Sequence, residues 1–218
     1  MVKSYSFDQH EIIKDIVKLY IPSGTIDLDP CYSKGVFYNT NLVNQPILKY
    51  DLYPQVQGVV QADCRHLPLA DSSLDSIMFD PPFLATTGPS LKKNDGSNII
   101  NKRFGVYETE KDLHQMYKEA LQEFYRLLKP NGILVFKCQD KVSSGKQYMT
   151  HMYATLMAED IGFYTRDMFV LLVKNRIVAD WQTKNQQHAR KFHSYFIVFQ
   201  KPKNSRKMSW KQMKEIIR

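Results

Sequence analysis

Four short segments in the first 80 residues combine apolar residues with a final aspartate. They read TIDLD, ILKYD, VVQAD and SIMFD, and they end at Asp29, Asp51, Asp63 and Asp80. Apolar runs of this length that stop at a turn-forming residue are typical of β-strands. When such strands alternate with helices they form a mostly parallel sheet, and ligands bind outside the carboxyl ends of its strands. The pattern therefore predicts four acids close together at a ligand-binding edge.

The rest of the chain supplies helices for such a sheet. Asp8 precedes apolar residues at helical spacing up to Tyr20, which predicts a capped helix. No helical pattern separates the last two expected strands, so an antiparallel element is expected there. The predicted fold is a Rossmann-like, doubly wound α/β sheet, mostly parallel, with an antiparallel edge strand. The other elements are expected as helices at about 108–128, ended by Pro130, Asn131 and Gly132, and at 147–162, and as strands at 132–138, 163–174 and 193–201.

The last of the four acids opens the most distinctive stretch, Asp80-Pro81-Pro82-Phe83. Proline has no backbone N–H to donate to a sheet ladder, so the strand must stop at Asp80. Any chemistry of these four residues then takes place at the carboxyl end of a strand.

Composition narrows the class of protein. The chain has 218 residues, a formal net charge of +8 and 43% hydrophobic residues, enough for a sizeable core. The positive charge favours a polyanionic partner such as nucleic acid. Three scattered cysteines do not predict a disulfide framework, and no apolar run is long enough to span a bilayer, so we expect a cytoplasmic protein without membrane contact. His188 and His193 have no Cys or acid to complete a ligand set, so no metal site is expected.

These motifs resemble class I S-adenosylmethionine-dependent methyltransferases, and in particular the DNA methylases that act on the amino group of adenine N6 or cytosine N4. LDPCYSKG is similar to the family's first motif, Asp51 to its second, ADC at 62–64 to its third, and DPPF to its fourth. GILVFK and ARKFHSYFIVFQK are similar to its later strands. The resemblance implies the class I methyltransferase fold, with S-adenosylmethionine as cofactor.

Each residue of the DPPF motif has an expected catalytic role. An exocyclic amine on a base is a poor nucleophile because its lone pair is delocalised into the ring. The carboxylate of Asp80 and the carbonyl of Pro81 could accept its two N–H bonds and direct the lone pair at the methyl group. Pro82 would fix that carbonyl, and Phe83 would stack on an extruded base. Alignment then accounts for most of the catalysis.

The cofactor-binding residues are expected in the three preceding motifs. Asp51 is the candidate for the ribose hydroxyls. Asp63 could accept a hydrogen bond from the adenine amino group, and the backbone N–H of Cys64 could donate one to the ring. The methionine part would lie over the first motif, which has one glycine where the family usually has several. Its cofactor-binding candidates are Asp29, Pro30, Cys31, Ser33 and Gly35.

A long polar stretch follows the DPPF motif. Residues 84–107 are predicted to form a substrate-facing loop, with Lys92, Lys93, Lys102 and Arg103 as candidate phosphate contacts. We expect a methyltransferase domain at 1–201 and a basic tail at 202–218. No segment resembles a target-recognition domain, so recognition would have to come from the Lys-rich segment 84–107, from the C-terminal tail or from a protein partner.

The predicted function is methylation of an exocyclic base amine, with adenine N6 in DNA favoured. Two alternatives remain open at this stage. Similar motifs occur in enzymes that methylate RNA bases or a protein glutamine, and a catalytically silent fold could serve as a nucleic-acid-binding subunit. The charge of +8 favours nucleic acid over protein.

Overall fold

A computed structural model describes residues 1–83, 85, 107–143, 145–174 and 186–204. Its main sheet has the strand order β1-β9-β10-β6-β5-β2-β3-β4. Strands β2 to β6 and β9 run in parallel, and β10 is antiparallel to both of its neighbours, β6 and β9. The predicted mixed α/β sheet is confirmed, and its antiparallel strand lies at the expected side, with β9 and the short β1 beyond it. The strands are β1 (Tyr5–Ser6), β2 (Leu28–Asp29), β3 (Leu48–Asp51), β4 (Val60–Gln61), β5 (Leu74–Phe79), β6 (Leu128–Cys138), β9 (Tyr164–Leu172) and β10 (His193–Gln200).

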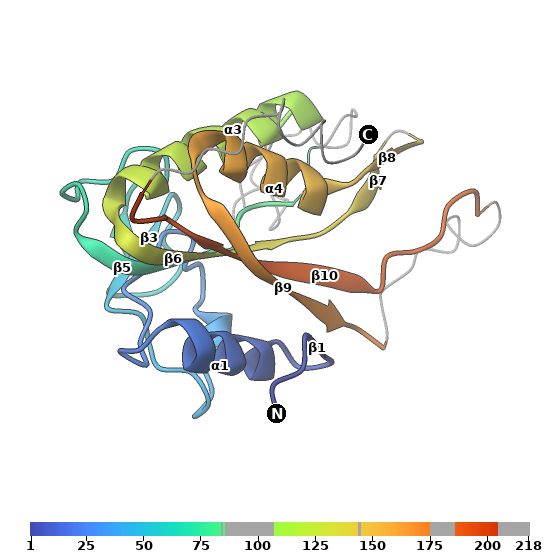
Figure 1. Ribbon diagram of the computed structural model, residues 1–218. Helices are drawn as coiled ribbons and strands as arrows, with labels where there is room; N and C mark the ends of the chain where they lie inside the picture. Colours follow the sequence, from blue (N-terminus) through green and yellow to red (C-terminus); the bar gives the residue numbers. More distant parts are fainter. Residues whose placement is uncertain (84, 86–106, 144, 175–185, 205–218) are drawn as a thin grey trace.

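Helices cover both faces of this sheet (Figure 1). Helix α1 (Gln9–Tyr20) lies on one face, and α3 (Glu110–Leu127) and α4 (Thr150–Ile161) lie together on the other. The side chain of Asp8 accepts from the backbone N–H of His10 at 2.8 Å and caps α1, as the sequence predicts. Helix α3 begins with a capping box between Thr109 and Asp112.

Strand β6 shows why the sheet is buried on both faces. Leu134, Phe136 and Cys138 belong to the core under α3 and α4, whereas Ile133 and Val135 belong to the core under α1. This alternation follows from the two-residue period of a strand. A continuous apolar run therefore serves two cores, as expected for a central parallel strand.

Two segments differ from the sequence prediction. Lys141–Ser143 (β7) and Lys146–Tyr148 (β8) form a separate antiparallel hairpin, so the expected helix at 147–162 begins only at Thr150. The helix expected to 128 ends at Leu127, ahead of Pro130, and strand β6 already pairs with β5 at Leu128. In both places cross-strand pairing decides a boundary that local spacing does not fix.

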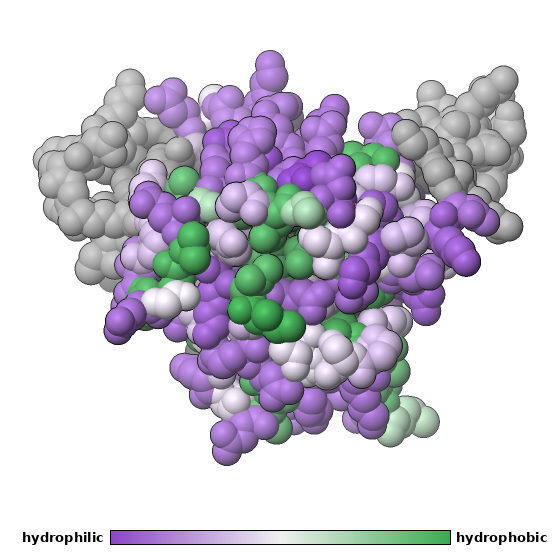
Figure 2. Space-filling view, turned by 90° about the vertical axis from the view of Figure 1, so that its left-hand side faces the viewer, coloured by the Kyte–Doolittle hydropathy of each residue, from purple (hydrophilic) through white to green (hydrophobic). Residues whose placement is uncertain are grey.

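The connections between β2 and β4 contain no α-helix. Residues 30–59 contain one 3-10 helix, η1 (Val36–Tyr38). Apolar side chains gather on the surface at this side of the molecule (Figure 2), and residues 42–60 include Leu42, Ile47, Leu52, Tyr53, Val56 and Val60 as exposed large apolar residues. Among the described residues, none of the helices has the length and apolar character that crossing a bilayer requires.

Candidate active site

The pairing of β5 with β6 brings Asp80 beside Lys137. Phe79 lies opposite Phe136, and the next residues of the two strands, Asp80 and Lys137, meet just beyond this pair. The Nζ atom of Lys137 lies 3.5 Å from Oδ2 of Asp80. The same Nζ atom is surrounded by aromatic rings, with centroids at 4.7, 5.7 and 5.6 Å for Phe37, Phe83 and Phe196. The ammonium is therefore held at one place on the sheet edge by aromatic faces and by one carboxylate.

The second oxygen of Asp80 is buried and has no hydrogen-bond partner among the described residues. Burial raises the pKa of Asp80, and Lys137 opposes this effect by favouring the carboxylate. A buried carboxylate oxygen without a donor is costly in free energy unless a ligand supplies the donor. This atom is therefore the clearest acceptor position of the site.

The backbone carbonyls of Pro82 and Phe83, in the DPPF motif, are held by side chains from elsewhere in the chain. The hydroxyl of Tyr117, on α3, donates to the carbonyl of Pro82 at 2.6 Å. The ammonium of Lys141 donates to the carbonyl of Phe83 and pairs with Glu110 at 2.9 Å. These contacts hold the backbone of the motif at Pro82 and Phe83.

Asp29 organises the turn after β2. Its Oδ1 accepts from the backbone N–H of Cys31 at 2.9 Å, and its Oδ2 accepts from the hydroxyl of Tyr38 at 2.8 Å. Burial raises the pKa of Asp29 to about 7, because these two hydrogen bonds only partly offset the loss of solvent and because Asp80 and Asp51 are nearby. Asp29 is 2% exposed, so it can affect a ligand only indirectly, by holding the turn in place.

Asp51 ties the same turn to β3. Its Oδ2 accepts from the backbone N–H of Ser33 at 2.7 Å, and its Oδ1 accepts from that of Tyr53 at 2.7 Å. A carboxylate oxygen can accept more than one hydrogen bond, so these contacts orient the group without exhausting it.

Gly35 is required by the geometry of this turn. Its φ of +65° lies in the left-handed region, and a Cβ at this position would approach the hydroxyl oxygen of Tyr32 to 2.3 Å. The ring of Tyr32 stacks on that of Tyr38, with centroids 5.7 Å apart. One glycine with two stacked tyrosines thus forms the turn for which the resembled family uses a glycine-rich segment.

Asp63 lies just beyond β4 and is engaged by Arg65. Oδ2 of Asp63 accepts from Nη2 of Arg65 at 2.6 Å, and Arg65 also pairs with Glu119 at 3.0 Å. Hydrogen bonds from Arg65 lower the pKa of Asp63 and keep it ionised. The predicted contact of Asp63 with the cofactor adenine would have to share this carboxylate with Arg65.

Two of the three thiols meet in the same region. A hydrogen bond with Cys64, together with burial, raises the pKa of Cys31 well above its ordinary value. Both thiols are free, and this pKa shift keeps Cys31 protonated and unreactive. Cys31 and Cys64 therefore serve as small apolar parts of the wall.

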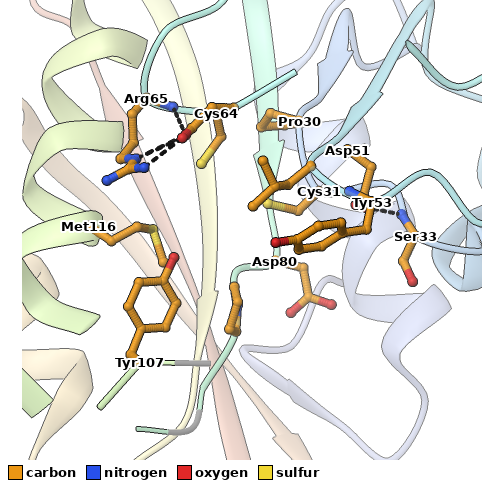
Figure 3. A pocket seen from close by; sticks show the side chains of 13 residues that line it. Pro30, Cys31, Ser33, Asp51, Tyr53, Cys64, Arg65, Asp80, Tyr107 and Met116 are labelled. Atoms are coloured by element: carbon orange, nitrogen blue, oxygen red, sulfur yellow. Dashed lines mark hydrogen bonds and ion pairs between the residues drawn. The ribbon is translucent and has the colours of Figure 1, made fainter. Parts of the chain in front are cut away.

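These elements line a cavity that opens to solvent, with about 560 Å³ of empty space (Figure 3). In the figure, Tyr107 and Met116 stand on one side, Asp51 and Tyr53 on the other, and the carboxyl of Asp80 lies at its lower end. A second hollow, lined by Asp29 and the turn up to Tyr38, shares Cys31, Ser33 and Asp80 with it. The lining residues of the cavity are Pro30, Cys31, Ser33, Asp51, Leu52, Tyr53, Asp63, Cys64, Arg65, Asp80, Pro82, Tyr107 and Met116.

Most of the sequence candidates thus lie at one edge of the sheet. The four candidates Lys92, Lys93, Lys102 and Arg103 lie outside the described residues. Tyr107, Tyr117 and Lys141 are not singled out by the sequence, because nothing local marks their contacts with the motif. The sequence indicates Lys137 only weakly, as a lysine at the end of an apolar strand. This position is equally consistent with a side chain that faces solvent.

Comparison with known proteins identifies the class of this chain. Residues 74–218 match the model of the family described as DNA methylase, whose members act at N6 or N4 of a base. The chain belongs to this DNA methylase family. The matched segment begins at β5, so Asp80 and the DPPF motif lie inside it and Asp29, Asp51 and Asp63 lie before it. The search of curated proteins found no match to this chain.

Solved structures are similar to the chain in fold. A Haloferax volcanii protein described as a methyltransferase, solved with its activator, is 14% identical over 88% of this chain and 89% of that one, at a TM-score of 0.51. A protein described as a DNA modification methylase from Thermus thermophilus is 18% identical over 71% of this chain, at a TM-score of 0.46. The cytosine-N4-specific PvuII DNA methyltransferase is 15% identical over 65% of this chain and 48% of its own length, at a TM-score of 0.47. The chain spans 58% of the length of the Thermus protein.

The raised pKa of Asp29 predicts a specific pH dependence of folding stability. With a folded pKa of about 7 and an ordinary value of 3.8, the folded state binds more protons than the unfolded state between these values. The contribution of Asp29 to the free energy of unfolding therefore falls as the pH rises from about 4 to about 7. Asp29→Asn removes it, so the variant should gain stability relative to the parent across this window in urea titrations. Asp160→Asn, on the exposed side of α4, is the control and should track the parent. A constant difference between Asp29→Asn and the parent at every pH would contradict the assignment.

Proposed function

We propose that the chain methylates N6 of adenine in DNA. The observation that carries the proposal is the buried Oδ1 of Asp80, which has no donor among the described residues and stands at the head of the DPPF motif. A base amine supplies the missing donor. The larger ring system of adenine offers more area than cytosine for stacking on Phe83, which favours the purine.

The methylase uses S-adenosylmethionine, in keeping with its family. Its cavity is lined by both apolar and polar groups, and Asp51 presents an oriented carboxylate there at the end of β3. These features fit a cofactor with a ribose and an adenine ring. Asp51 would hold the ribose hydroxyls, and Pro30, Cys31 and Ser33 would line the adjoining part. When bound, S-adenosylmethionine supplies a methyl group activated by a sulfonium.

The residues of the chain prepare the amine for attack. The carboxylate of Asp80 and the carbonyl of Pro81 accept its two N–H bonds, which directs the nitrogen lone pair away from the base ring. Phe83 stacks on the base, while Tyr117 and Lys141 hold the backbone carbonyls beyond Pro81. The amine becomes cationic on gaining a fourth substituent, and the carboxylate of Asp80 is placed to accept the proton that it loses.

DNA as the substrate is supported by the family and by charge. The family is described as DNA methylase, and a net charge of +8 favours a polyanion. The candidate contacts Lys92, Lys93, Lys102 and Arg103 remain a proposal, as do the substrate-facing loop at 84–107, the basic tail and a partner for recognition. The domain boundary at 201 is likewise a proposal.

Asp80→Ala tests the chemistry. The variant should lose methyl transfer in single turnover by orders of magnitude, while its affinity for S-adenosylmethionine stays within a few-fold, because Asp80 acts on the substrate amine. Mass analysis of nucleosides from DNA treated with the parent should show N6-methyladenine. N4-methylcytosine instead would correct the base, and a fully active variant would remove Asp80 from the mechanism.

Asp51→Asn tests the ribose contact. The amide keeps one acceptor oxygen for the turn but lacks the charge, and losing a charged hydrogen bond costs about 1.5 to 3 kcal/mol. The affinity for S-adenosylmethionine in calorimetry should therefore fall by about tenfold to 100-fold. Asp75→Asn, on the exposed part of β5, should bind like the parent. An unchanged affinity of a folded Asp51→Asn would place the ribose elsewhere.

Lys137→Met tests how Asp80 stays ionised. Removing the ammonium 3.5 Å from Asp80 takes away a charge that favours the carboxylate, so the pKa of Asp80 should rise further. The acid limb of the profile of kcat/KM against pH should move to higher pH, with activity recovering in alkaline buffer. Lys129→Met, which removes a surface lysine paired with Asp75, is the control. An acid limb at the parent position would show that Lys137 does not act through Asp80.

A further inference from the structure

A groove lies between α3, α4 and the hairpin strand β8, beside the DPPF motif. Its neighbour on the site side is Lys141, which joins Glu110 in the groove to the carbonyl of Phe83. Lys141 therefore links the lining of the groove to the backbone of the DPPF motif. Its lining residues are Glu110, Lys111, His114, Gln115, Lys118, Tyr148, Tyr153 and Met157.

Aromatic side chains form the wall of this groove. The ring centroid of His114 lies 5.2 Å from that of Tyr153 and 6.3 Å from that of Tyr148. Tyr153 is 39% exposed, so part of its ring is open to the groove. Exposed ring faces of this kind are the stacking platforms on which proteins bind unpaired bases.

The groove also contains unsatisfied polar atoms. Nε2 of His114 and Oε1 of Glu110 are buried and have no hydrogen-bond partner among the described residues, and the amino group of a base could donate to the latter. Burial lowers the pKa of His114, so its ring is neutral at neutral pH and carries one donor and one acceptor nitrogen. The edge of a base, which carries both donors and acceptors, can satisfy such a ring.

The charges around the groove favour a phosphate backbone. Lys111 and Lys118 line it on α3, and Nζ of Lys146 lies 5.4 Å from the ring centroid of Tyr148. The acid in the lining, Glu110, is paired with Lys141 at 2.9 Å. The surface at this groove is therefore cationic, as a polyanionic ligand requires.

We propose that this groove binds a nucleotide of the DNA that flanks the methylated base. Its base stacks on Tyr153 and hydrogen-bonds to His114, and the neighbouring phosphates contact Lys111 and Lys118. The inference rests on the proposed function, since it takes DNA as the substrate. It gives the methylase a second base-binding position, built from α3 and α4, that is separate from Phe83.

Stacking is tested with Tyr153→Ala. The affinity of the full chain for a fluorescent DNA oligonucleotide that the parent methylates should fall by about tenfold, as expected for one lost base–aromatic contact. Tyr153→Phe keeps the ring and should bind like the parent. Tyr164→Ala removes an equally exposed tyrosine, 58% exposed at the start of β9, and should also bind like the parent. Calorimetry with S-adenosylmethionine checks that each variant is folded.

Charge is tested with the double variant Lys111→Ala/Lys118→Ala. The slope of log affinity against log salt should decrease by roughly two units, one for each lost phosphate contact. Lys14→Ala/Lys18→Ala, on α1 at the other face of the sheet, should leave the slope unchanged. Parent-like affinity and slope in the groove variants, beside a parent that methylates DNA, would overturn the groove proposal alone. A parent that neither binds nor methylates DNA would overturn the proposed function and the groove with it.

Discussion

The pairing of β5 with β6 is the constraint on which the site depends. Phe79 and Phe136 lie opposite each other in this pair, with their ring centroids 5.1 Å apart and within the core under α3. A shift of one residue would turn every side chain of the strand to the other face, so burial of these rings fixes the register strongly. Because the register is fixed, Asp80 and Lys137 meet at the carboxyl end. Asp80 of the DPPF motif therefore lies beside Lys137 because the apolar rings one residue earlier in each strand pack against each other.

The acids at this edge differ in their environments, and this difference separates their roles. Asp29 is buried and holds a turn, with a pKa of about 7, whereas Asp63 is ion-paired with Arg65 and its pKa is lowered. Asp80 lies between these cases, with burial raising its pKa and Lys137 opposing the rise. Pairs of acids whose environments shift their pKa values differently are typical of sites that divide structural and chemical tasks.

The helices on one face of the sheet also contribute side chains that hold the DPPF motif. Helix α3 supplies Tyr117, which holds the carbonyl of Pro82, and Glu110, which pairs with Lys141. The same helix lines the groove proposed for a flanking nucleotide. Its capping box fixes where the helix begins and thereby the height of these side chains above the sheet edge. Helix α3 therefore both holds the DPPF motif in place and forms part of the neighbouring groove.

The sequence by itself determined the strands that end on acids, the capped first helix, and the place of DPPF at the end of a strand. These features are local, since alternation, capping and proline chemistry act over a few residues. Local spacing does not predict the hairpin β7–β8, because its pairing competes with a helical pattern at 147–149, and the contacts of Tyr117 and Lys141 join residues far apart in the chain. The tertiary structure alone decided that Lys137 faces Asp80 and that Tyr38 and Tyr32 complete a turn with a single glycine. These outcomes depend on strand register and on side chains that meet across the sheet edge, and no spacing within one segment encodes them.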